Sequence, residues 1–404
     1  MDEDAENSGE ETTCLLSGTV AIIVTHVRGT GPAIHLETYL TQRCPKVLSI
    51  YHPLVYESPA LSSYRLFEDG KLVETGKHLL RGPEPAIRLQ EVILTIRWVR
   101  RLAPRSDLFI GVDALNCIAG IMLRAMKHTK RVMFYVIDWS PKRFDNNMLN
   151  GIYHLSDRVA ALFATETWNV SPAIDKGRWH GAFWTLMGRF AQTRTRIVEI
   201  GVARVNSEIV NGPRLPNRLV FLGHLLEKQG LQQVIAALPQ VAESFSDVDL
   251  IVIGSGPYQA ALTELAHNIG VENRVRFLGY IDDEDEVLRL LSSASIGLAT
   301  YLESEESFTK FADPGKLKNY LAAGLPIVMT RVPFNADSLE ESDCAVLVKG
   351  SVEEVAGGIC LLLSEDVSER HYRRVRALDM VKDLDWESVF ANALTPINSR
   401  SKPK

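Results

Sequence analysis

The chain has 404 residues, of which 46% are hydrophobic and 23% are charged, and its formal net charge is -6. This composition excludes a disordered, collagenous or disulfide-rich protein, and the length exceeds what one hydrophobic core organises, so two domains are expected. No apolar run reaches the roughly 18 residues that span a bilayer, and the five scattered cysteines lack metal-ligand spacing. We therefore expect a cytoplasmic protein with reduced thiols and no metal site.

The charge is unevenly spread along the chain. Residues 1–200 hold 24 Lys and Arg against 21 Asp and Glu, and six of those acids lie in the first eleven residues. Residues 1–17 are therefore expected to form an acidic disordered leader. Without the leader the first half is basic (24 against 15) and the second half is acidic (20 against 29). This asymmetry predicts that only the first half faces an anionic surface, with no nucleic-acid partner.

From Thr19 onward, short β-branched runs alternate with amphipathic stretches, which predicts βαβ units and a parallel sheet. The expected strands are "TVAIIVTHV", "KVLSI", "DLFIGVD", "RVMFYVID", "AALFAT" and "RIVEIG", with a helix over 33–42. One interruption, "YRLFEDGKLVETG", predicts a hairpin that turns at Asp69 and Gly70.

The first strand is followed by the loop "VTHVRGTGPAIHLETYL", in which Arg28, Gly29, Thr30 and Gly31 precede a helix. Glycines let a backbone approach a ligand closely, and a helix N-terminus favours negative charge. The loop is not a complete dinucleotide fingerprint, and a tight turn without a ligand is the alternative.

Asp138 ends the apolar run "VMFYVID", with Trp139 directly after it. A carboxylate at the carboxyl end of a central strand suits general base work or the binding of a substrate hydroxyl. The alternative is that Asp138 caps the following turn.

Two stretches of the first half combine basic and apolar side chains, as anionic headgroup layers favour. The first is "RLQEVILTIRWVRRLAPR", residues 88–105, and the second is "DKGRWHGAFWTLMGRF", residues 175–190, with Trp179, Phe183, Trp184 and Met187. Their alternatives are an ordinary packed helix and a packed loop.

The polar stretch 201–217 separates the halves and predicts a linker at 204–217, between a domain at 18–203 and a domain at 218–384. In the second domain the strand pattern restarts, at "RLVFLG", and continues through "VDLIVIGSGP", "RVRFLGY", "SIGLATY", "PIVMT" and "CAVLV". Two doubly wound domains predict a cleft lined by the carboxyl ends of both sheets.

The stretch "FADPGKLKNYLAAGLPIVMT", residues 311–330, predicts a helix with Asp313 as N-cap, Pro314 in the first position and Gly324 at the end. A cation in the first turn opposes the helix dipole, so Lys316 is unexpected there. The sequence leaves two readings open, an anion held by Lys316 and an ion pair between Lys316 and Asp313.

In order, these pieces resemble the GT-B glycosyltransferases of the retaining family 4 type. The resemblance rests on "RLVFLGHLLEKQGLQQVIAALPQV", "VDLIVIGSGP", "NRVRFLGYID", "SIGLATYL" and "LKNYLAAGLPIV", and more loosely on "SDLFIGVDALNCIAGIMLR" and "YVIDWSPKRF". It implies two Rossmann-like domains facing a cleft, with "DLDWESVFANAL" forming a terminal helix (residues 385–404 with the tail) that crosses back to the first domain.

The resemblance also implies a hexosyltransferase that takes its sugar from a nucleotide diphosphate sugar, with no metal and no other cofactor. The usual arginine and lysine of the family fall on His224 and Gln229, and its paired glutamates fall on Phe311 and Asn319. We expect Lys316 to supply the positive charge of the missing arginine. Asp138 is the second expected catalytic residue. The expected donor-binding residues are Gly223, His224, Lys228, Gln229, Gly254, Gly256, Tyr280, Asp313, Gly315, Leu317 and Asn319.

The expected acceptor is a glycan or polyprenyl-linked lipid of cell-surface polysaccharide or glycolipid synthesis, held by Arg28 to Gly31 and Trp139 on the inner face of the cell membrane. Two other readings stay open. One is a nucleotide-sugar epimerase, and the other is a catalytically silent GT-B partner or scaffold protein, which the missing glutamates suggest.

Overall fold

The protein is described here by a computed structural model that covers residues 16–26, 31–54, 59–303 and 308–395. Contacts divide the chain into two compact units, Met1–Glu199 with Trp386–Lys404, and Ile200–Asp385. The segment predicted as a linker, 204–217, therefore belongs to the second unit, where α8 (Ser207–Val210) buries Val210. No helix in the described residues is long and apolar enough to cross a bilayer.

The first unit contains an eight-stranded sheet in the order β4-β3-β2-β1-β5-β6-β7-β8. Only β3 runs antiparallel to the other strands, and it forms the predicted hairpin with β4 at the edge of the sheet. Both Asp69 and Gly70 have positive φ, as a two-residue hairpin loop requires. The strands are β1 (Val20–Thr25), β2 (Lys46–Tyr51), β3 (Leu61–Glu68), β4 (Lys71–Leu79), β5 (Ser106–Val112), β6 (Thr129–Val136), β7 (Glu166–Asn169) and β8 (Thr195–Ile197).

The helices of the first unit are α2 (Pro32–Thr41), α3 (Glu84–Leu102), α4 (Ala114–Ala125), α5 (Asn147–Phe163), α6 (Pro172–Arg178), α7 (Ala182–Gln192) and α16 (Trp386–Leu394). One strand prediction was wrong, because "AALFAT" includes the last turn of α5 and the strand starts only at Glu166. Alanine and leucine favour helix, and the amphipathic pattern of α5 continues through this run.

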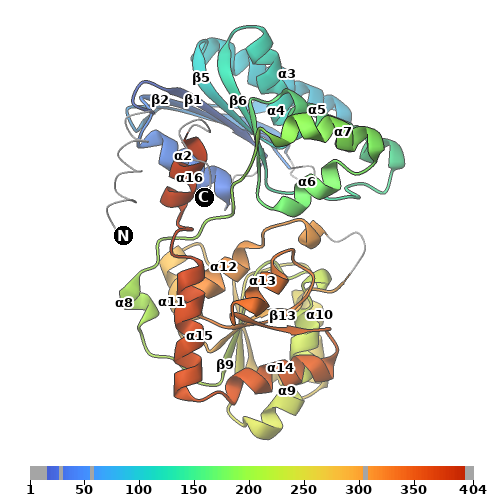
Figure 1. Ribbon diagram of the computed structural model, residues 1–404, viewed down its shortest axis with the longest axis vertical. Coiled ribbons are helices and arrows are strands. Elements are labelled where there is room, and N and C mark those ends of the chain that lie inside the picture. Colours follow the sequence, from blue (N-terminus) through green and yellow to red (C-terminus); the bar gives the residue numbers. More distant parts are fainter. Residues whose placement is uncertain (1–15, 27–30, 55–58, 304–307, 396–404) are drawn as a thin grey trace. The chain divides into compact units, whose positions relative to one another are not determined.

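The C-terminal helix returns to the first unit, as predicted. In Figure 1, α16 lies beside α2, and the two helices contact each other. The rings of His35 and Trp386 stack with their centroids 4.4 Å apart. The rings of Tyr39 and Phe390 lie 5.7 Å apart.

The second unit is built on a six-stranded parallel sheet in the order β11-β10-β9-β12-β13-β14. Numbered within the unit, this is the order 3-2-1-4-5-6 of a doubly wound nucleotide-binding fold, as predicted. The strands are β9 (Arg218–Leu222), β10 (Asp249–Ile253), β11 (Val275–Gly279), β12 (Ile296–Ala299), β13 (Ile327–Thr330) and β14 (Ala345–Val348).

Two hydrophobic clusters cover the two faces of this sheet. Along β9, Leu219 and Phe221 face one cluster and Val220 faces the other, which is the alternation of a strand buried on both sides. The helices are α9 (Leu231–Ser244), α10 (Gln259–Asn268), α11 (Glu284–Ser292), α12 (Gly315–Ala322), α13 (Ala336–Glu341), α14 (Val352–Leu363) and α15 (Val367–Met380), with 3-10 turns η1 (Glu227–Gln229), η2 (Glu272–Arg274) and η3 (Phe308–Lys310).

Candidate functional site

The second sheet changes direction between β9 and β12. The strands after β9 extend to one side, and the strands after β12 extend to the other. Open α/β sheets bind ligands in the crevice at the carboxyl ends of the strands where this reversal occurs. Lys316, in the first turn of α12, reaches this point because its Nζ lies 4.1 Å from the ring centroid of Phe221 in β9 and 4.8 Å from that of Tyr301 after β12.

Tyr320 fixes α12 in this position. Its side chain is fully buried, and its hydroxyl accepts a hydrogen bond from the Leu222 N–H at 2.8 Å and donates one to the Leu298 carbonyl at 3.0 Å. These two carbonyl and amide groups belong to the neighbouring strands β9 and β12. A side chain at Gly297 would collide with the Tyr320 ring, at 2.5 Å. The start of α12 is therefore held at the ends of both central strands.

Lys316 is a partly buried cation that lacks an acidic partner among the described residues. Its Nζ donates to Gln229 Oε1 at 2.6 Å and otherwise faces the Phe221 and Tyr301 rings, which attract a cation. Burial disfavours the charged form and lowers the pKa of Lys316 from its ordinary 10.5 to about 7. An anion bound here would supply the missing counter-charge.

The neighbouring Lys318 is the lysine that pairs with Asp313, so the ion pair considered for Lys316 does not form. Lys318 Nζ lies 2.6 Å from Asp313 Oδ2 and donates to the Ile200 carbonyl at 2.9 Å. Asp313 is not the N-cap of α12, which begins at Gly315 after Pro314. It is buried, and its carboxylate also accepts from the Ile200 N–H at 2.8 Å. Asp313 therefore has a structural role and is not open to a nucleotide-sugar donor.

The glycines after β9 and β10 allow their two loops to pack against each other. Gly254 has φ 129°, and a Cβ there would lie 2.0 Å from the carbonyl oxygen of Gly223. A Cβ on Gly256 would lie 2.3 Å from that of Leu225. A Cβ on Gly223, in contrast, would approach Lys316 Nζ to 3.2 Å. Gly223 borders the lysine directly, whereas Gly254 and Gly256 support the loop beside it.

The first sheet reverses direction between β1 and β5, and a cluster of charged side chains occupies that point. His26 follows β1, Asp113 follows β5, and Glu91 reaches them from α3. His26 Nε2 lies 3.1 Å from Glu91 Oε2, and His26 Nδ1 lies 3.5 Å from Asp113 Oδ2. None of the three was among the predicted site residues.

A family model and several curated proteins resemble this chain in sequence. Residues 216–365 match the family model for glycosyl transferases group 1. A phosphatidyl-myo-inositol mannosyltransferase of Mycobacterium leprae is 27% identical over 184 residues, which are 45% of this chain and 46% of that protein. A GDP-mannose-dependent alpha-(1-6)-phosphatidylinositol monomannoside mannosyltransferase of Mycobacterium tuberculosis is 31% identical over 151 residues, 36% of this chain and 38% of that protein. The chain thus spans less than half the length of these curated relatives.

Among solved structures, the Anabaena protein Alr3699/HepE in complex with UDP and glucose superposes with a TM-score of 0.64 at 14% identity, covering 95% of this chain and all of that chain. The apo structure of OtsA gives 0.63 at 14% identity over 94% of this chain and 100% of that chain. The chain has the GT-B fold, and residues 216–365 of its second unit resemble the glycosyl transferases group 1.

Within the second unit, the remaining predicted donor residues differ in accessibility. His224 and Lys228 are exposed, whereas Leu317 is fully buried in the core. Asn319 lies one turn after Lys316, and its side-chain amide makes no hydrogen bond to a described residue. Tyr280 is 59% exposed, with its hydroxyl 3.1 Å from Asp282 Oδ1. Gly315 starts α12, and a Cβ there would lie 3.4 Å from Ile200.

In the first unit of this GT-B protein, Asp138 follows β6 and pairs with Arg143. Trp139, a predicted acceptor contact, is only 2% exposed, and its ring centroid lies 5.6 Å from that of His154. Gly31 precedes α2 with φ 130°. Arg28, Gly29 and Thr30 lie outside the described residues, as does most of the predicted leader 1–17.

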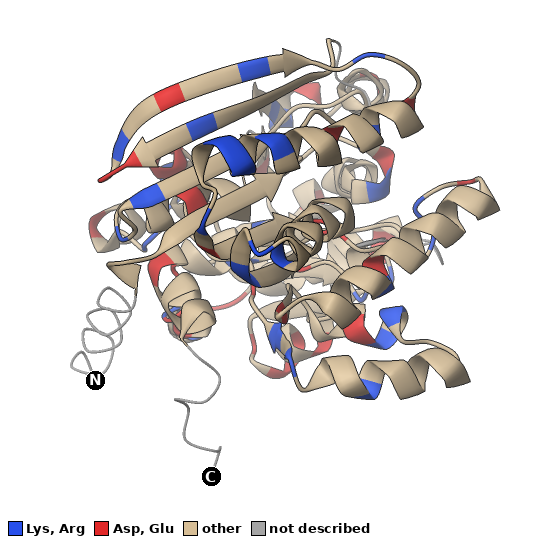
Figure 2. Ribbon diagram, turned by 90° about the horizontal axis from the view of Figure 1, so that it is seen from above, with Lys and Arg blue, Asp and Glu red and all other residues tan. Residues whose placement is uncertain are grey.

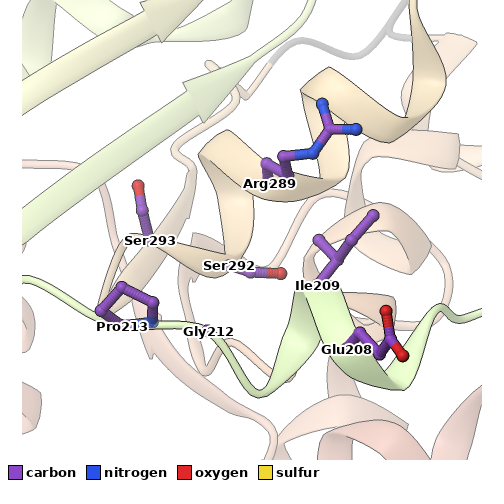
Figure 3. Close-up of a pocket in the computed structure, with 7 residues that line it drawn as sticks. All are labelled: Glu208, Ile209, Gly212, Pro213, Arg289, Ser292 and Ser293. Carbon is purple, nitrogen blue, oxygen red and sulfur yellow. The ribbon is translucent and has the colours of Figure 1, made fainter.

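A separate pocket of about 440 Å³ lies between α8 and α11 of the second unit, and Figure 3 shows its lining. Ser292 and Ser293 belong to the segment that enters β12 at its amino end. The pocket is therefore at the opposite edge of the sheet from Lys316. It is lined by Glu208, Ile209, Gly212, Pro213, Arg289, Ser292 and Ser293.

Proposed function

We propose that the protein transfers a hexose from a nucleotide diphosphate sugar, bound by the second unit, to a hydroxyl group of a glycan or polyprenyl-linked acceptor bound by the first. The observation that carries the proposal is Lys316, a partly buried cation without an acidic partner in the described residues, at the reversal point of a doubly wound sheet. The leaving nucleotide diphosphate is an anion, and such sites stabilise developing negative charge with fixed donors. The two relatives described above are mannosyltransferases, and one structural neighbour was solved in complex with UDP and glucose.

On the donor side, we assign the diphosphate to Lys316 and the exposed Lys228, together with free amides in the first turn of α12. Gln229 orients the Lys316 ammonium through its 2.6 Å hydrogen bond. Asn319, one turn further along the helix, is the proposed ribose ligand, and backbone near Tyr280 is the proposed contact of the base. Transfer would need no metal, because lysines and helix amides supply the positive charge, and would retain the configuration of the sugar.

On the acceptor side, Asp138 and Gly31 are the proposed contacts within the described residues. Asp138 forms an ion pair with Arg143. A carboxylate accepts hydrogen bonds, so Asp138 is the proposed contact for a hydroxyl group of the acceptor.

The experiment that tests donor binding is a thermal-shift panel of UDP, GDP, ADP and their glucose and mannose conjugates. A ligand present at 100 times its dissociation constant adds about 2.7 kcal/mol to the free energy of unfolding. We expect at least one nucleoside diphosphate to raise the melting temperature of the wild type and to have no effect on Lys316→Met. The absence of any response in the wild type would refute the donor site.

A second candidate function is a catalytically silent nucleotide-sugar-binding partner, favoured by Phe311 and Asn319 in the places of the family's paired glutamates. Slow donor hydrolysis without an acceptor distinguishes the two, since an active transferase releases free sugar and a silent protein releases none. The same assay detects the epimerase alternative through a changed sugar in the recovered nucleotide conjugate.

We also propose that the first unit docks on the anionic inner face of the cell membrane. Residues 146–194 carry exposed basic side chains, Lys176 and Arg189. Of their three acidic residues, Asp157 and Glu166 are buried and Asp175 is partly buried. Figure 2 marks Lys and Arg in blue. Two neighbouring helices of this stretch, α5 and α7, expose large apolar residues, Met148, Ile152, Leu155, Phe183, Leu186 and Phe190.

This surface differs from the predicted one, because Trp179 is buried and Trp184 lies under the Arg158 guanidinium, 4.4 Å away. We expect a Phe183→Ser, Phe190→Ser variant to lose binding to vesicles that contain phosphatidylglycerol. A matched Val367→Ser, Tyr372→Ser variant alters exposed apolar residues of the second unit and should bind as the wild type does. Equal binding by both variants would refute the proposed surface.

A further inference from the structure

Four side chains of alternating charge form a chain of contacts at the reversal point of the sheet in the first unit. Arg88 Nη1 lies 2.6 Å from Glu91 Oε1, Glu91 Oε2 lies 3.1 Å from His26, and His26 Nδ1 lies 3.5 Å from Asp113 Oδ2. Their side chains are 18%, 2%, 12% and 37% exposed in that order. Asp113 is therefore the member of this chain that solvent or a ligand reaches most easily.

The histidine in this chain carries a proton at neutral pH. Burial alone would lower the pKa of His26, but its contacts with Asp113 and Glu91 outweigh burial and raise the pKa to about 9. Burial would likewise raise the pKa of Glu91, but hydrogen bonds from His26 and Arg88 keep it below the ordinary value. The four side chains therefore form a fixed series of full charges, and such charges are costly to bury.

A second histidine, His52, lies next to His26 and is uncharged. Burial, and then the positive charge of His26, lower the pKa of His52 to about 3. Its ring nitrogens lie 2.8 Å from Ser62 Oγ and 2.9 Å from Thr95 Oγ1. The amide nitrogen of Asn116 lies 3.2 Å from His26 Nδ1 and donates to the Val112 carbonyl. Asp113 is the carboxylate nearest to His26 Nδ1.

The backbone of Asp113 is also constrained. It has φ 76° and ψ 159°, a conformation that L-residues rarely adopt and that usually persists only where the surroundings enforce it. Its N–H donates to the Tyr135 carbonyl, and its carbonyl accepts from the Cys117 N–H. A Cβ on Gly111 would lie 2.5 Å from Cys117, so α4 starts very close to β5. Strained backbone and perturbed titratable groups together are characteristic of functional sites.

We infer that Asp113 binds a hydroxyl group of a neutral, polyhydroxylated acceptor, and that His26 and Glu91 are positioning residues that hold its carboxylate in place. The chemistry of the ligand follows from the end of the chain, because a carboxylate accepts hydrogen bonds from hydroxyl groups and repels phosphate. The site therefore takes the sugar or cyclitol part of a substrate. This inference rests on the proposed sugar transfer and names the part of the first unit that recognises the acceptor.

Side-chain NMR of the histidines tests the inference, with glucose and myo-inositol as probes. We expect either probe to shift the His26 imidazole signals in the wild type, and Asp113→Asn to weaken that response at least tenfold. Asp113→Asn should also lower the pKa of His26 measured in the same spectra, which a purely structural role of Asp113 in loop packing would not do. Asp107→Asn is the matched control, because Asp107 lies at the amino end of the same strand and pairs with Lys130 at 2.7 Å.

Asp113→Gly serves as a second variant, since glycine adopts the φ of this position without strain. It should fold, keep the UDP thermal shift, and lose the probe response. A His26 response in Asp113→Gly that equals the wild type would overturn the inference, and so would the lack of any response in the wild type. The absence of a thermal shift with every nucleoside diphosphate of the panel would refute the proposed donor site instead, so the two failures are distinguishable.

Discussion

Lys316 and Lys318 lie two residues apart in α12, and we predict that the same substitution has opposite effects on stability at the two positions. Methionine keeps an unbranched apolar stem and removes the charge. At position 316 the charge is held without an acidic partner in the described residues, whereas at position 318 it compensates the buried carboxylate of Asp313. Lys316→Met should therefore leave the free protein as stable as the wild type or more so, and Lys318→Met should destabilise it.

The magnitudes follow from these environments. Each pKa unit corresponds to about 1.4 kcal/mol, so a pKa lowered from 10.5 to about 7 means that the Lys316 charge costs a few kcal/mol in the folded state. Solvent at this partly buried position reduces that figure. Removing one partner of a buried ion pair typically costs about 3–5 kcal/mol, which sets the expected loss for Lys318→Met.

Urea denaturation followed by two signals measures the difference. Far-UV circular dichroism reports both units, whereas tryptophan fluorescence reports the first unit alone, because all six tryptophans of the chain lie there. The midpoint of the dichroism transition should fall for Lys318→Met and stay or rise for Lys316→Met. The fluorescence transition serves as an internal reference within the same sample.

UDP binding provides a second comparison of the Lys316→Met and Lys318→Met variants. UDP should raise the melting temperature of the wild type and Lys318→Met, and should leave Lys316→Met unchanged. If Lys316→Met is destabilised as strongly as Lys318→Met, Lys316 is a structural residue. If Lys316→Met binds UDP with wild-type affinity, the electrostatic reasoning for this site is wrong.

Three further predictions concern the same unit. UDP affinity should fall by up to tenfold per pH unit above about pH 7, because free Lys316 is then neutral and must take up a proton with the anion; calorimetry in buffers of different ionisation enthalpy measures that uptake, and an affinity independent of pH would contradict it. Tyr320→Phe should cost about 1–3 kcal/mol in urea denaturation, since the Leu222 N–H loses its partner, and should weaken UDP binding by releasing α12; unchanged stability would show that another group satisfies Leu222. Gly254→Ala should cost more than about 3 kcal/mol because of its φ and its 2.0 Å contact, whereas Gly151→Ala, with open space around it in α5, should stabilise by up to about 1 kcal/mol; equal effects in urea denaturation would contradict the crowding at Gly254.

The architecture of the second unit was predictable from sequence because each strand is a short apolar run that ends in a glycine or a polar loop. The same local grammar located α12 and the lysine in its first turn. The sequence pattern could not assign the partners of the two lysines. In the structure α12 begins at Gly315 rather than at Pro314, and Asp313 pairs with Lys318.

The cluster in the first unit was only partly predictable. His26 and Asp113 each follow a predicted strand, and the carboxyl ends of neighbouring parallel strands lie at one edge of a sheet, so these two were within reach of sequence reasoning. Glu91 gives no such signal, because it lies in the middle of α3 in a stretch that reads as an ordinary amphipathic helix. The sequence also did not indicate that Trp139 is buried, since a tryptophan after a strand gives no sign of whether its ring turns inward.

The return of α16 to the first unit makes that unit discontinuous in the chain. The second unit, Ile200–Asp385, is translated as one uninterrupted segment, whereas α16, which contacts His35 and Tyr39, is translated only after all of the second unit. Domains of a nascent chain generally fold in the order in which they become complete. In this protein the order of completion is reversed relative to the sequence, because the first unit lacks a helix until the second unit has been translated.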